Sequence, residues 1–580
     1  MLRALPYAAV WILDFEYIAK DGERPIVVCM VAHDLVSSRW IHLWQGDFST
    51  PPFPIDDNTL LVGYAAAAEW SCFIALGWPM PARCIDLFAE FTRITNGAFA
   101  GKLFPSLLAA AAHYGIDTIS SDQKGAMRDL ILTGGPWSER EQQDILHYCA
   151  ADVRVTADLL QAMLPQLVRS ANTLGGALLR GRYTSAVARM EWNGVPIDVP
   201  TLTRLRNGWQ DIKCDLIADI DRRYRVYDGT TFVAARFASY IAREGISWPR
   251  LPSGNLALDD DTFSKLAKSY PAIAPLRELR HSLGKMRLNS LTVGQDGRNR
   301  TSMMPFGSKT GRNQPSNSRF IFGGARWLRS LIQPPPGRAL AYVDWSSQEI
   351  AIAAALSGDE ELWKAYDSGD PYMSFAVQAG MAPPLSTKLT HKAERQRAKA
   401  IVLAVGYGMS AESMAVQAGL HVDEARELLL RHKFTYRKFW DWAINNQNAG
   451  LLGFPLQTTF GWTWQAGFGT SVNPRSLLNW PMQAGGAEMM RLACCDLTER
   501  GIMLCCSVHD ALLVEGPVSE IHDVISQTRA AMERSSELVL GRGKIVKTEV
   551  DIIRFPNRYK SESGIEMWDR VMAILNARGW

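Results

Sequence analysis

The sequence predicts a multidomain protein in which an α/β domain precedes a larger α+β region, and three observations support this. The chain has 580 residues, which is too long for a single hydrophobic core. Residues 1–165 alternate strand-like apolar runs with helical patterns, as α/β domains do. Residues 175–290 and 385–450 are mostly helical, and strand patterns appear between and after them.

The remaining elements follow from the same hydrophobic and turn patterns. In chain order the sequence predicts a strand ending at Asp14, a strand over 27–35, a helix over 137–168, an irregular stretch over 295–318, a strand entering a helix over 337–359, and a hairpin over 502–515.

Composition narrows the class of protein. Apolar residues make up 47% of the chain and charged residues 21%, as in a soluble globular enzyme. No run of about 18 uncharged apolar residues is present, so we expect no membrane span. Nine cysteines without a CxxC pair argue against a zinc site or a disulfide framework, so we expect a reduced, cytoplasmic protein. The net charge of +3 neither demands nor excludes nucleic acid.

Acidic residues gather in two N-terminal segments. Asp14 and Glu16 lie two apart on the apolar strand VWILDFEY, so they share a face and repel each other unless cations lie between them. Tyr148 and Asp152 have helical i,i+4 spacing and also share a face. These pairs would converge on a metal cluster; the alternative is an edge-strand acid pair and a solvated helix acid.

Together these segments resemble the 3′–5′ exonuclease domain of the DnaQ/RNase D type. The resemblance implies an RNase H-like domain in which Asp14, Glu16 and Asp152 bind metal and Tyr148 orients a water. The middle element of that family corresponds to LLVGYAAAAEWSCFIALG (60–77). Glu69 falls where the family has Asp, and its extra methylene would reposition the carboxylate.

A basic stripe begins the helical segment HKAERQRAKAIVLAVGYGMS (391–410). Its four members are spaced by four residues: Arg395, Lys399, Leu403 and Tyr407. An Arg fork and a Lys point charge one turn apart suit an oligophosphate, and the apolar and aromatic side chains suit a base or sugar. The alternative is an amphipathic surface helix with a basic end.

Two aspartates end apolar strands in separate segments. Asp344 ends the strand of ALAYVDWSSQEIAIAAALSGDEEL, and Ser346 or Ser347 would cap the helix that follows. Asp510 follows His509 at the turn of CCSVHDALLVE. Because a divalent metal is usually bound by more than one carboxylate, a metal at Asp510 would need a second acid, and the next residue is Ala511.

These three segments resemble motifs B, A and C of family A DNA polymerases, the bacterial polymerase I type, in a compact phage-like layout. The resemblance implies that Asp344 and Asp510 hold two Mg²⁺ ions and that Arg395 and Lys399 bind the incoming triphosphate. It also implies that Lys399 donates a proton to the departing pyrophosphate. Glu349 would block the 2′-hydroxyl and select deoxyribonucleotides.

The chain departs from the family pattern at several positions. Trp345 stands where the family usually has Tyr, and Leu403 stands where it usually has Phe or Tyr. Ala351 takes the place of an Arg that is often found there. Ala511 follows Asp510 where motif C usually has Glu. Since neighbouring residues on a strand point to opposite faces, we expect Ala511 to mark the loss of an auxiliary carboxylate only.

Further segments resemble the family's contacts to primer-template DNA. They contribute Thr310 and Arg312 of SKTGR, His509 of motif C, and the helix positions Arg475, Asn479 and Gln483, which are spaced by four as in the helix that reads the minor groove. The alternative for the last three is a capped amphipathic helix.

The resemblance implies the domain organisation. It predicts an exonuclease-like domain over 1–170 and a right-hand polymerase domain over 171–580, with the thumb at about 180–300, the palm at about 301–360 and 476–580, and the fingers at about 361–475. We therefore expect a monomeric DNA polymerase that proofreads. Its ligands would be primer-template DNA, deoxynucleoside triphosphates, and two Mg²⁺ at each site, replaceable by Mn²⁺. A processivity factor or other replisome proteins are further expected partners.

Three alternatives stay open at this point. A single-subunit RNA polymerase shares parts of two motifs, although Glu349 and the exonuclease-like segments argue against it. A non-catalytic nucleic-acid-binding relic would fit Ala511, Leu403 and Glu69. A nuclease with a vestigial polymerase half would degrade DNA without extending it.

Overall fold

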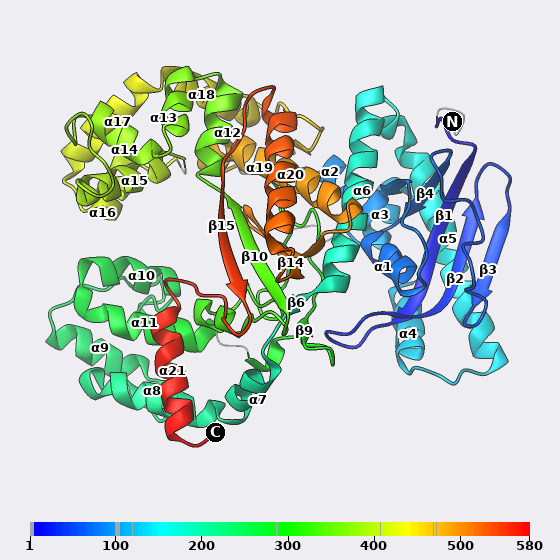
Figure 1. Cartoon of the computed structure of the whole chain (residues 1–580), viewed down its shortest axis with the longest axis horizontal. Helices are drawn as coiled ribbons and strands as arrows, with labels where there is room; N and C mark the ends of the chain where they lie inside the picture. Colours follow the sequence, from blue (N-terminus) through cyan, green and yellow to red (C-terminus); the bar gives the residue numbers. More distant parts are fainter. Residues whose placement is uncertain are drawn as a thin grey trace.

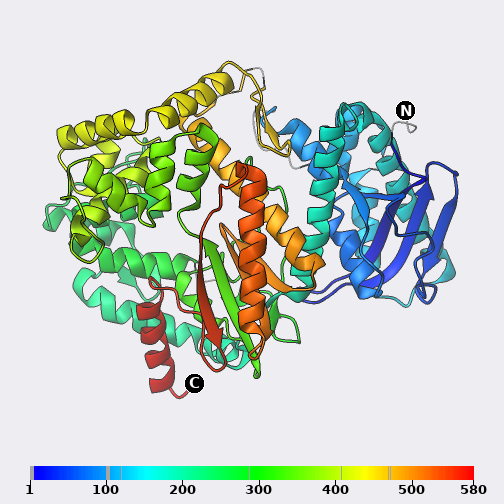
Figure 2. The same ribbon diagram turned by 45° about the horizontal axis from the view of Figure 1, so that its top comes forward.

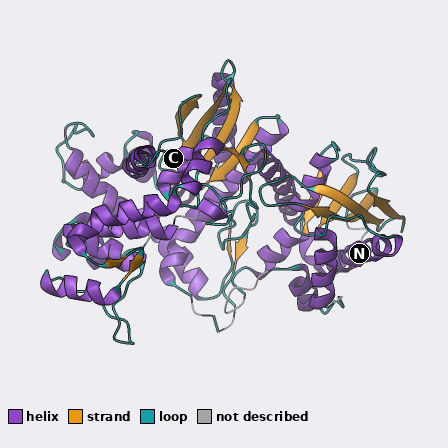
Figure 3. Cartoon of the chain, turned by 90° about the horizontal axis from the view of Figure 1, so that it is seen from below, coloured by secondary structure: helices purple, strands orange, loops and turns teal. Residues whose placement is uncertain are grey.

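The computed structural model describes residues 5–98, 105–118, 120–285, 288–406, 408–467, 469–470 and 472–580. Tyr407 of the basic stripe lies outside the described residues. An N-terminal sheet and a central sheet are each covered by helices, and the candidate site residues lie on these sheets, on their connecting turns and on the helices (Figure 1, Figure 3). Among the described helices, none is long and apolar enough to cross a membrane.

The N-terminal sheet has five strands in the order β3-β2-β1-β4-β5. These are β1 (Ala9–Ile18), β2 (Ile26–Asp34), β3 (Trp40–Trp44), β4 (Thr59–Gly63) and β5 (Arg83–Asp86). Strand β1 pairs antiparallel with β2 and parallel with β4. Val10 and Ile12 enter one hydrophobic core, whereas Trp11 and Leu13 enter another, so β1 is buried on both faces.

Helices cover both faces of this sheet. They are α1 (Ala67–Ala75), α2 (Leu87–Thr95), α3 (Leu107–Tyr114), α4 (Ser121–Leu132) and α5 (Glu139–Leu167). Ser138 begins α5 with a capping box, its hydroxyl accepting from the Glu141 N–H while Glu141 accepts from the Ser138 N–H. Helix α5 packs against β1 and β2, and α4 packs against β1. The predicted helix over 137–168 is therefore present, with Pro165 inside its last turn.

The long helix α6 (Ala171–Asn193) joins the two halves of the molecule (Figure 1). It packs against α1 and β5 on one side and against α19 (Pro474–Glu499) and β13 (Met503–Val508) on the other. A Cβ at Gly181 would lie 2.0 Å from the Cys84 carbonyl oxygen, so this crossing requires glycine.

The central sheet has four antiparallel strands in the order β13-β14-β10-β15. The three strands not yet named are β10 (Arg338–Trp345), β14 (Ala511–Pro517) and β15 (Thr548–Arg554). Helix α20 (Ile521–Leu540) packs across β10, β14 and β15 (Figure 2), and α19 packs against β13. One face of the sheet is thereby buried.

Helices surround the central sheet in two groups (Figure 1). The first consists of α7 (Val199–Asn207), α8 (Trp209–Tyr224), α9 (Ala234–Arg243), α10 (Asp260–Ser269), α11 (Ala274–Lys285) and the C-terminal α21 (Ile565–Ala577), which packs on α8. The second consists of α12 (Gln348–Ser357), α13 (Glu360–Asp367), α14 (Pro371–Gln378), α15 (Lys392–Gly406), α16 (Ala411–Ala418), α17 (Val422–Thr435) and α18 (Arg437–Leu451).

Short elements complete the chain. The two-residue strands are β6 (Val195–Pro196) with β9 (Arg298–Asn299), β7 (Tyr227–Asp228) with β8 (Thr231–Phe232), and β11 (Leu456–Gln457) with β12 (Thr463–Trp464); 3₁₀ turns cover Pro271–Ile273, Leu288–Ser290 and Arg326–Leu331.

Two local predictions are wrong. Ser347 is the N-cap residue of α12, but its φ is 51° and no side chain caps the helix. The left-handed backbone turns the chain sharply after β10 and leaves the Ser346 hydroxyl bonded to Glu549 instead. The helical stretch expected from residue 385 begins only at Lys392, after a looped segment.

Candidate active site

Asp344 and Asp510 meet at one end of the central sheet. Asp344 lies next to the end of β10, and Asp510 lies with His509 in the two-residue turn between β13 and β14. The Trp345 N–H donates to the Asp510 carbonyl oxygen at 3.1 Å, which fixes the turn against β10. Both aspartates line a cavity of about 1410 Å³.

The pKa of each of the two carboxylates is raised. Burial raises the pKa of Asp344 to about 6, and the neighbouring Asp510, Glu549 and Asp551 charges add to the rise. Burial also raises the pKa of Asp510, against the opposing charge of Arg312. Crowded carboxylates of this kind are stabilised by a cation, and oxygen donors suit Mg²⁺, so the donor set fits a divalent metal.

Ala511 lies directly opposite Asp344 in the register of β10 and β14. Directly paired residues of a sheet share a face, so position 511 lies on the face of Asp344, although Ala511 does not line the cavity. The expectation that residue 511 need not face the metals stays a prediction. The turn at Asp510 interrupts the strand alternation on which that expectation relied. Ala511 is fully buried beside Asp344 and brings no carboxylate there.

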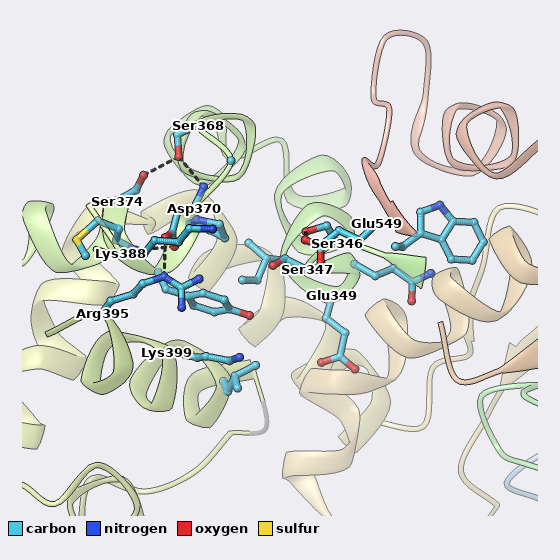
Figure 4. A pocket seen from close by; sticks show the side chains of 18 of the residues that line it. Ser346, Ser347, Glu349, Ser368, Asp370, Ser374, Lys388, Arg395, Lys399 and Glu549 are labelled. Atoms are coloured by element: carbon cyan, nitrogen blue, oxygen red, sulfur yellow. Dashed lines mark hydrogen bonds and ion pairs between the residues drawn. The ribbon is translucent and has the colours of Figure 1, made fainter. Parts of the chain in front are cut away.

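Glu549 lies opposite Asp344 on the other neighbouring strand, β15. It is exposed, lines the same cavity as Asp344, and accepts a hydrogen bond from the Ser346 hydroxyl at 3.0 Å (Figure 4). Sequence reasoning missed Glu549. No sequence pattern links Glu549 to Asp344, because the two residues are 205 positions apart and come together only through the pairing of β10 with β15.

Helix α15 supplies a basic wall to the cavity. Arg395, Lys399 and Leu403 line it, as the spacing by four predicts (Figure 4). The Arg395 Nε donates to Asp370 Oδ2 at 2.5 Å. The Tyr372 ring centroid lies 5.4 Å from the Arg395 guanidinium carbon and 5.5 Å from the Lys399 Nζ. Asp370 and Tyr372 thus hold the two cations in place, and the sequence did not indicate either.

Glu349 lies in the first turn of α12 and lines the same cavity. Burial raises its pKa, while the Arg312 charge opposes the rise. Figure 4 shows Glu349 on the wall that faces Lys399. The structure therefore brings Glu349 together with the two aspartates and the basic wall.

Arg312 lines this cavity and also a second one of about 1020 Å³. The second cavity is polar and includes Arg277, His281 and His509 in its lining. Thr310 is bonded to the Ser308 hydroxyl at 3.0 Å, so it lies in the same tight loop as Arg312. His509 and Arg312 therefore connect the two cavities.

The three expected minor-groove residues lie on α19 but line neither cavity. Arg475 is exposed and Gln483 is half-buried. Asn479 is buried, and its Oδ1 has no hydrogen-bond partner among the residues that the structure describes. The second cavity is reached by later residues of the same helix, Ala487 and Met490.

The N-terminal acids form a second cluster. Ligand atoms of Asp14, Glu16 and Cys149 lie within 4.8 Å of one another. Burial and the neighbouring carboxylates raise the pKa of Asp14 to about 8 and that of Glu16 to about 10. The Cys149 Sγ donates to Asp14 Oδ2 at 3.3 Å. Strand β1 and helix α5 thus bring the predicted acids together.

Glu69 and Asp152 each have a protein partner at this cluster. Glu69 is buried in α1 and its Oε2 accepts from the Phe15 N–H at 2.8 Å. The Lys124 Nζ, from α4, contacts both Asp152 oxygens at 2.7 and 2.9 Å and lies 5.8 Å from the Tyr148 ring centroid. Sequence reasoning missed Lys124, because its helix carries no motif.

The fold and the carboxylate-and-basic cleft define a polymerase of family A. The sequence model of "DNA polymerase family A" matches residues 249–553, more than half of the chain, and the protein belongs to this family. The family expected from the motifs is confirmed. The matched range begins after the N-terminal sheet.

Curated relatives are DNA polymerases I. The chain is 24% identical over 497 residues to the enzyme of Aquifex aeolicus, covering 79% of this chain and 84% of that one. It is 26% identical over 445 residues to that of Chloroflexus aurantiacus, covering 70% and 46%. Against the thermostable enzyme of Thermus thermophilus it is 24% identical, covering 76% and 56%. The chain thus spans about half the length of the latter two.

A solved structure shares the fold. The POL domain of Pol1 from M. smegmatis, in complex with DNA primer-template and dNTP, superposes with a TM-score of 0.68 at 18% identity. The match covers 95% of this chain and 96% of that one, so it extends over the N-terminal sheet as well as the central one.

Proposed function

We propose that the protein is a template-directed DNA polymerase that adds deoxynucleotides to a primer 3′ end. One observation carries this proposal: Asp344 and Asp510 line the same cavity as Arg395 and Lys399. Paired carboxylates and a basic wall are what phosphoryl transfer from a triphosphate requires. The M. smegmatis relative, which binds DNA primer-template and dNTP, supports the same assignment.

Each side chain has a role in this reaction. Asp344 and Asp510 would hold Mg²⁺, which supplies activation of the primer hydroxyl and charge stabilisation at the phosphates. Arg395, held by Asp370, grips the triphosphate, and Lys399 donates a proton to the leaving pyrophosphate. Glu349 limits the space beside the sugar and excludes a 2′-hydroxyl.

The architecture supports the right-hand arrangement. In this proposal the central sheet is the palm, α13–α18 are the fingers, and α7–α11 are the thumb. Arg312, Thr310 and His509 contact the primer-template duplex in the second cavity. The α19 residues Arg475, Asn479 and Gln483 meet the duplex near the primer end.

Primer extension with Mg²⁺ tests this function. We expect extension with deoxynucleoside triphosphates, a much lower rate with ribonucleotides, and loss of at least about 10³-fold in Asp344→Asn, because metal stabilisation contributes several kcal/mol. Robust extension by Asp510→Ala would falsify the assignment. Efficient ribonucleotide use would favour an RNA polymerase instead.

A second activity, 3′–5′ exonucleolytic proofreading, is supported by the N-terminal acid cluster. Asp14 and Glu16 on β1 and Asp152 on α5 converge, with Tyr148 one turn before Asp152. In this proposal the sheet and helices of residues 1–170 form an RNase H-like exonuclease domain. We expect a mismatched primer end to be excised in the absence of nucleotides, and Asp14→Asn to stop excision while extension continues.

A further inference from the structure

Lys124 occupies the N-terminal acid cluster as a tethered cation. Its Nζ bonds to both oxygens of Asp152, and only 19% of the Lys124 side chain and 10% of the Asp152 side chain are exposed. A capping box between Ser120 and Gln123 fixes the start of α4 at Ser121, three residues before Lys124. The lysine is therefore presented by a fixed helix and not by a loop.

The N-terminal cluster contains more acidic groups than cations. Four carboxyl groups meet there, and among the described residues none of Asp14, Glu16 and Glu69 has an ion-pair partner. Lys124 is the ion-pair partner of the fourth, Asp152. One lysine offsets only part of the negative charge that this cluster carries when its carboxyl groups are ionised, so the cluster has room for a further cation.

The remaining acids define where that cation binds. Glu69 uses Oε2 to accept from the Phe15 backbone, and both Asp152 oxygens bond to Lys124. Asp14 and Glu16 keep carboxylate oxygens that converge within 4.8 Å, and both residues are only partly buried. These two are the acids best placed to take a divalent ion from solvent.

We propose that Lys124 is a positioning residue of the exonuclease site and that its ammonium group takes the place of the ion that Asp152 would otherwise hold. The site then takes a single divalent ion, on Asp14 and Glu16. This inference rests on the exonuclease function proposed above. It departs from the two-ion site that the sequence resemblance implies. The ammonium group keeps Asp152 in place and supplies a fixed positive charge beside the ion.

Removing Lys124 has a specific consequence. Without it, the nearly buried Asp152 has no cationic partner, and an unpaired buried carboxylate is costly. Asp152 then becomes a free ligand next to Asp14 and Glu16. The Lys124→Met protein should therefore bind a second divalent ion that the parent protein excludes.

Mn²⁺ counting by electron paramagnetic resonance tests this on the full chain carrying Asp344→Asn and Asp510→Asn, which removes the ligands of the polymerase site. In this background we expect about one tightly bound Mn²⁺, rising to about two with Lys124→Met and staying at about one with Lys124→Arg. Arg128→Met, which removes an exposed cation from the same helix, is the matched control and should leave the count unchanged. Asp14→Asn should abolish the tight ion.

The inference is overturned if the Asp344→Asn, Asp510→Asn protein that keeps Lys124 already binds two Mn²⁺ ions and Lys124→Met leaves this count unchanged. The second ion would then displace Lys124 from Asp152. Thermal unfolding of each variant with and without Mn²⁺ identifies misfolded protein. If Lys124→Met misfolds, Lys124→Gln replaces it. Excision is measured separately in the same Asp344→Asn, Asp510→Asn background. Protein that binds one Mn²⁺ there and never degrades DNA refutes the exonuclease function, whereas excision with two ions bound refutes only the role of Lys124.

Discussion

Asp344 and Ala511 lie directly opposite each other on neighbouring antiparallel strands. A residue at position 511 therefore shares a face with the metal-binding candidate Asp344, and alanine leaves that position without a charge. On the other side of Asp344, β15 presents Glu549. The candidate polymerase site thus has two aspartates, an alanine where motif C usually has Glu, and one acid, Glu549, from a strand far along the chain.

Ala511→Glu restores a carboxylate opposite Asp344. We expect a change of no more than about tenfold in extension rate and a changed ratio of Mn²⁺- to Mg²⁺-supported activity, because two primary ligands already exist and the new group enters a fully buried position. Steady-state extension rates with each metal check this. Ala511→Gln, which adds the volume without the charge, separates packing from electrostatics. A rate equal to that of the parent with both metals contradicts the expectation.

Glu549→Gln removes the exposed acid beside Asp344. Because Glu549 contributes to the raised pKa of Asp344 and lines the cavity, its loss should weaken Mg²⁺ binding. We expect the Mg²⁺ concentration for half-maximal extension to rise several-fold, and the maximal rate to change little, since exposed charges are screened. Ser346→Ala, which loses only the hydrogen bond to Glu549, serves as the control and should have the smaller effect.

Asp370→Asn tests how Arg395 is held. Asparagine still caps α14, where Asp370 accepts from the Met373 N–H, but it no longer forms the ion pair with Arg395. We expect KM for deoxynucleoside triphosphate to rise several-fold while kcat stays close to that of the parent, because the guanidinium loses its fixed position. Asp423→Asn breaks an exposed ion pair to Arg426 and should leave both constants unchanged. A fall in kcat alone would argue against this role for Asp370.

His432 makes stability depend on pH. Burial among aromatic rings lowers its pKa from 6.5 to about 3, and its Nδ1 accepts from the Trp440 indole N–H at 3.1 Å. The unfolded chain binds this proton more tightly, so the free energy of unfolding is highest above pH 6.5 and falls as the pH drops toward 3. His432→Gln keeps an acceptor but cannot titrate. Denaturant unfolding at several pH values should show a shallower dependence over this range in the variant; an unchanged slope would mean that other groups dominate.

Much of the candidate site follows from short sequence spacings. Arg395, Lys399 and Leu403 repeat every four residues, and a helix necessarily places such residues on one face. Asp14 and Glu16 share a face because strand side chains alternate. The predicted capping by Ser346 or Ser347 failed because Ser347 lies at a turn with left-handed backbone angles, which depart from helix and strand values.

By itself, the sequence determined which residues are candidates to bear the chemistry and in what order they occur, and it pointed to the family that the sequence model matches. Only the tertiary structure decided which groups stand beside them. Glu549 reaches Asp344 through strand register, Asp370 reaches Arg395 through the packing of α14 on α15, and Lys124 reaches Asp152 through the packing of α4 on α5. Local spacing fixes the face on which a side chain lies, whereas a contact between distant segments depends on how whole elements pack, which no short pattern encodes.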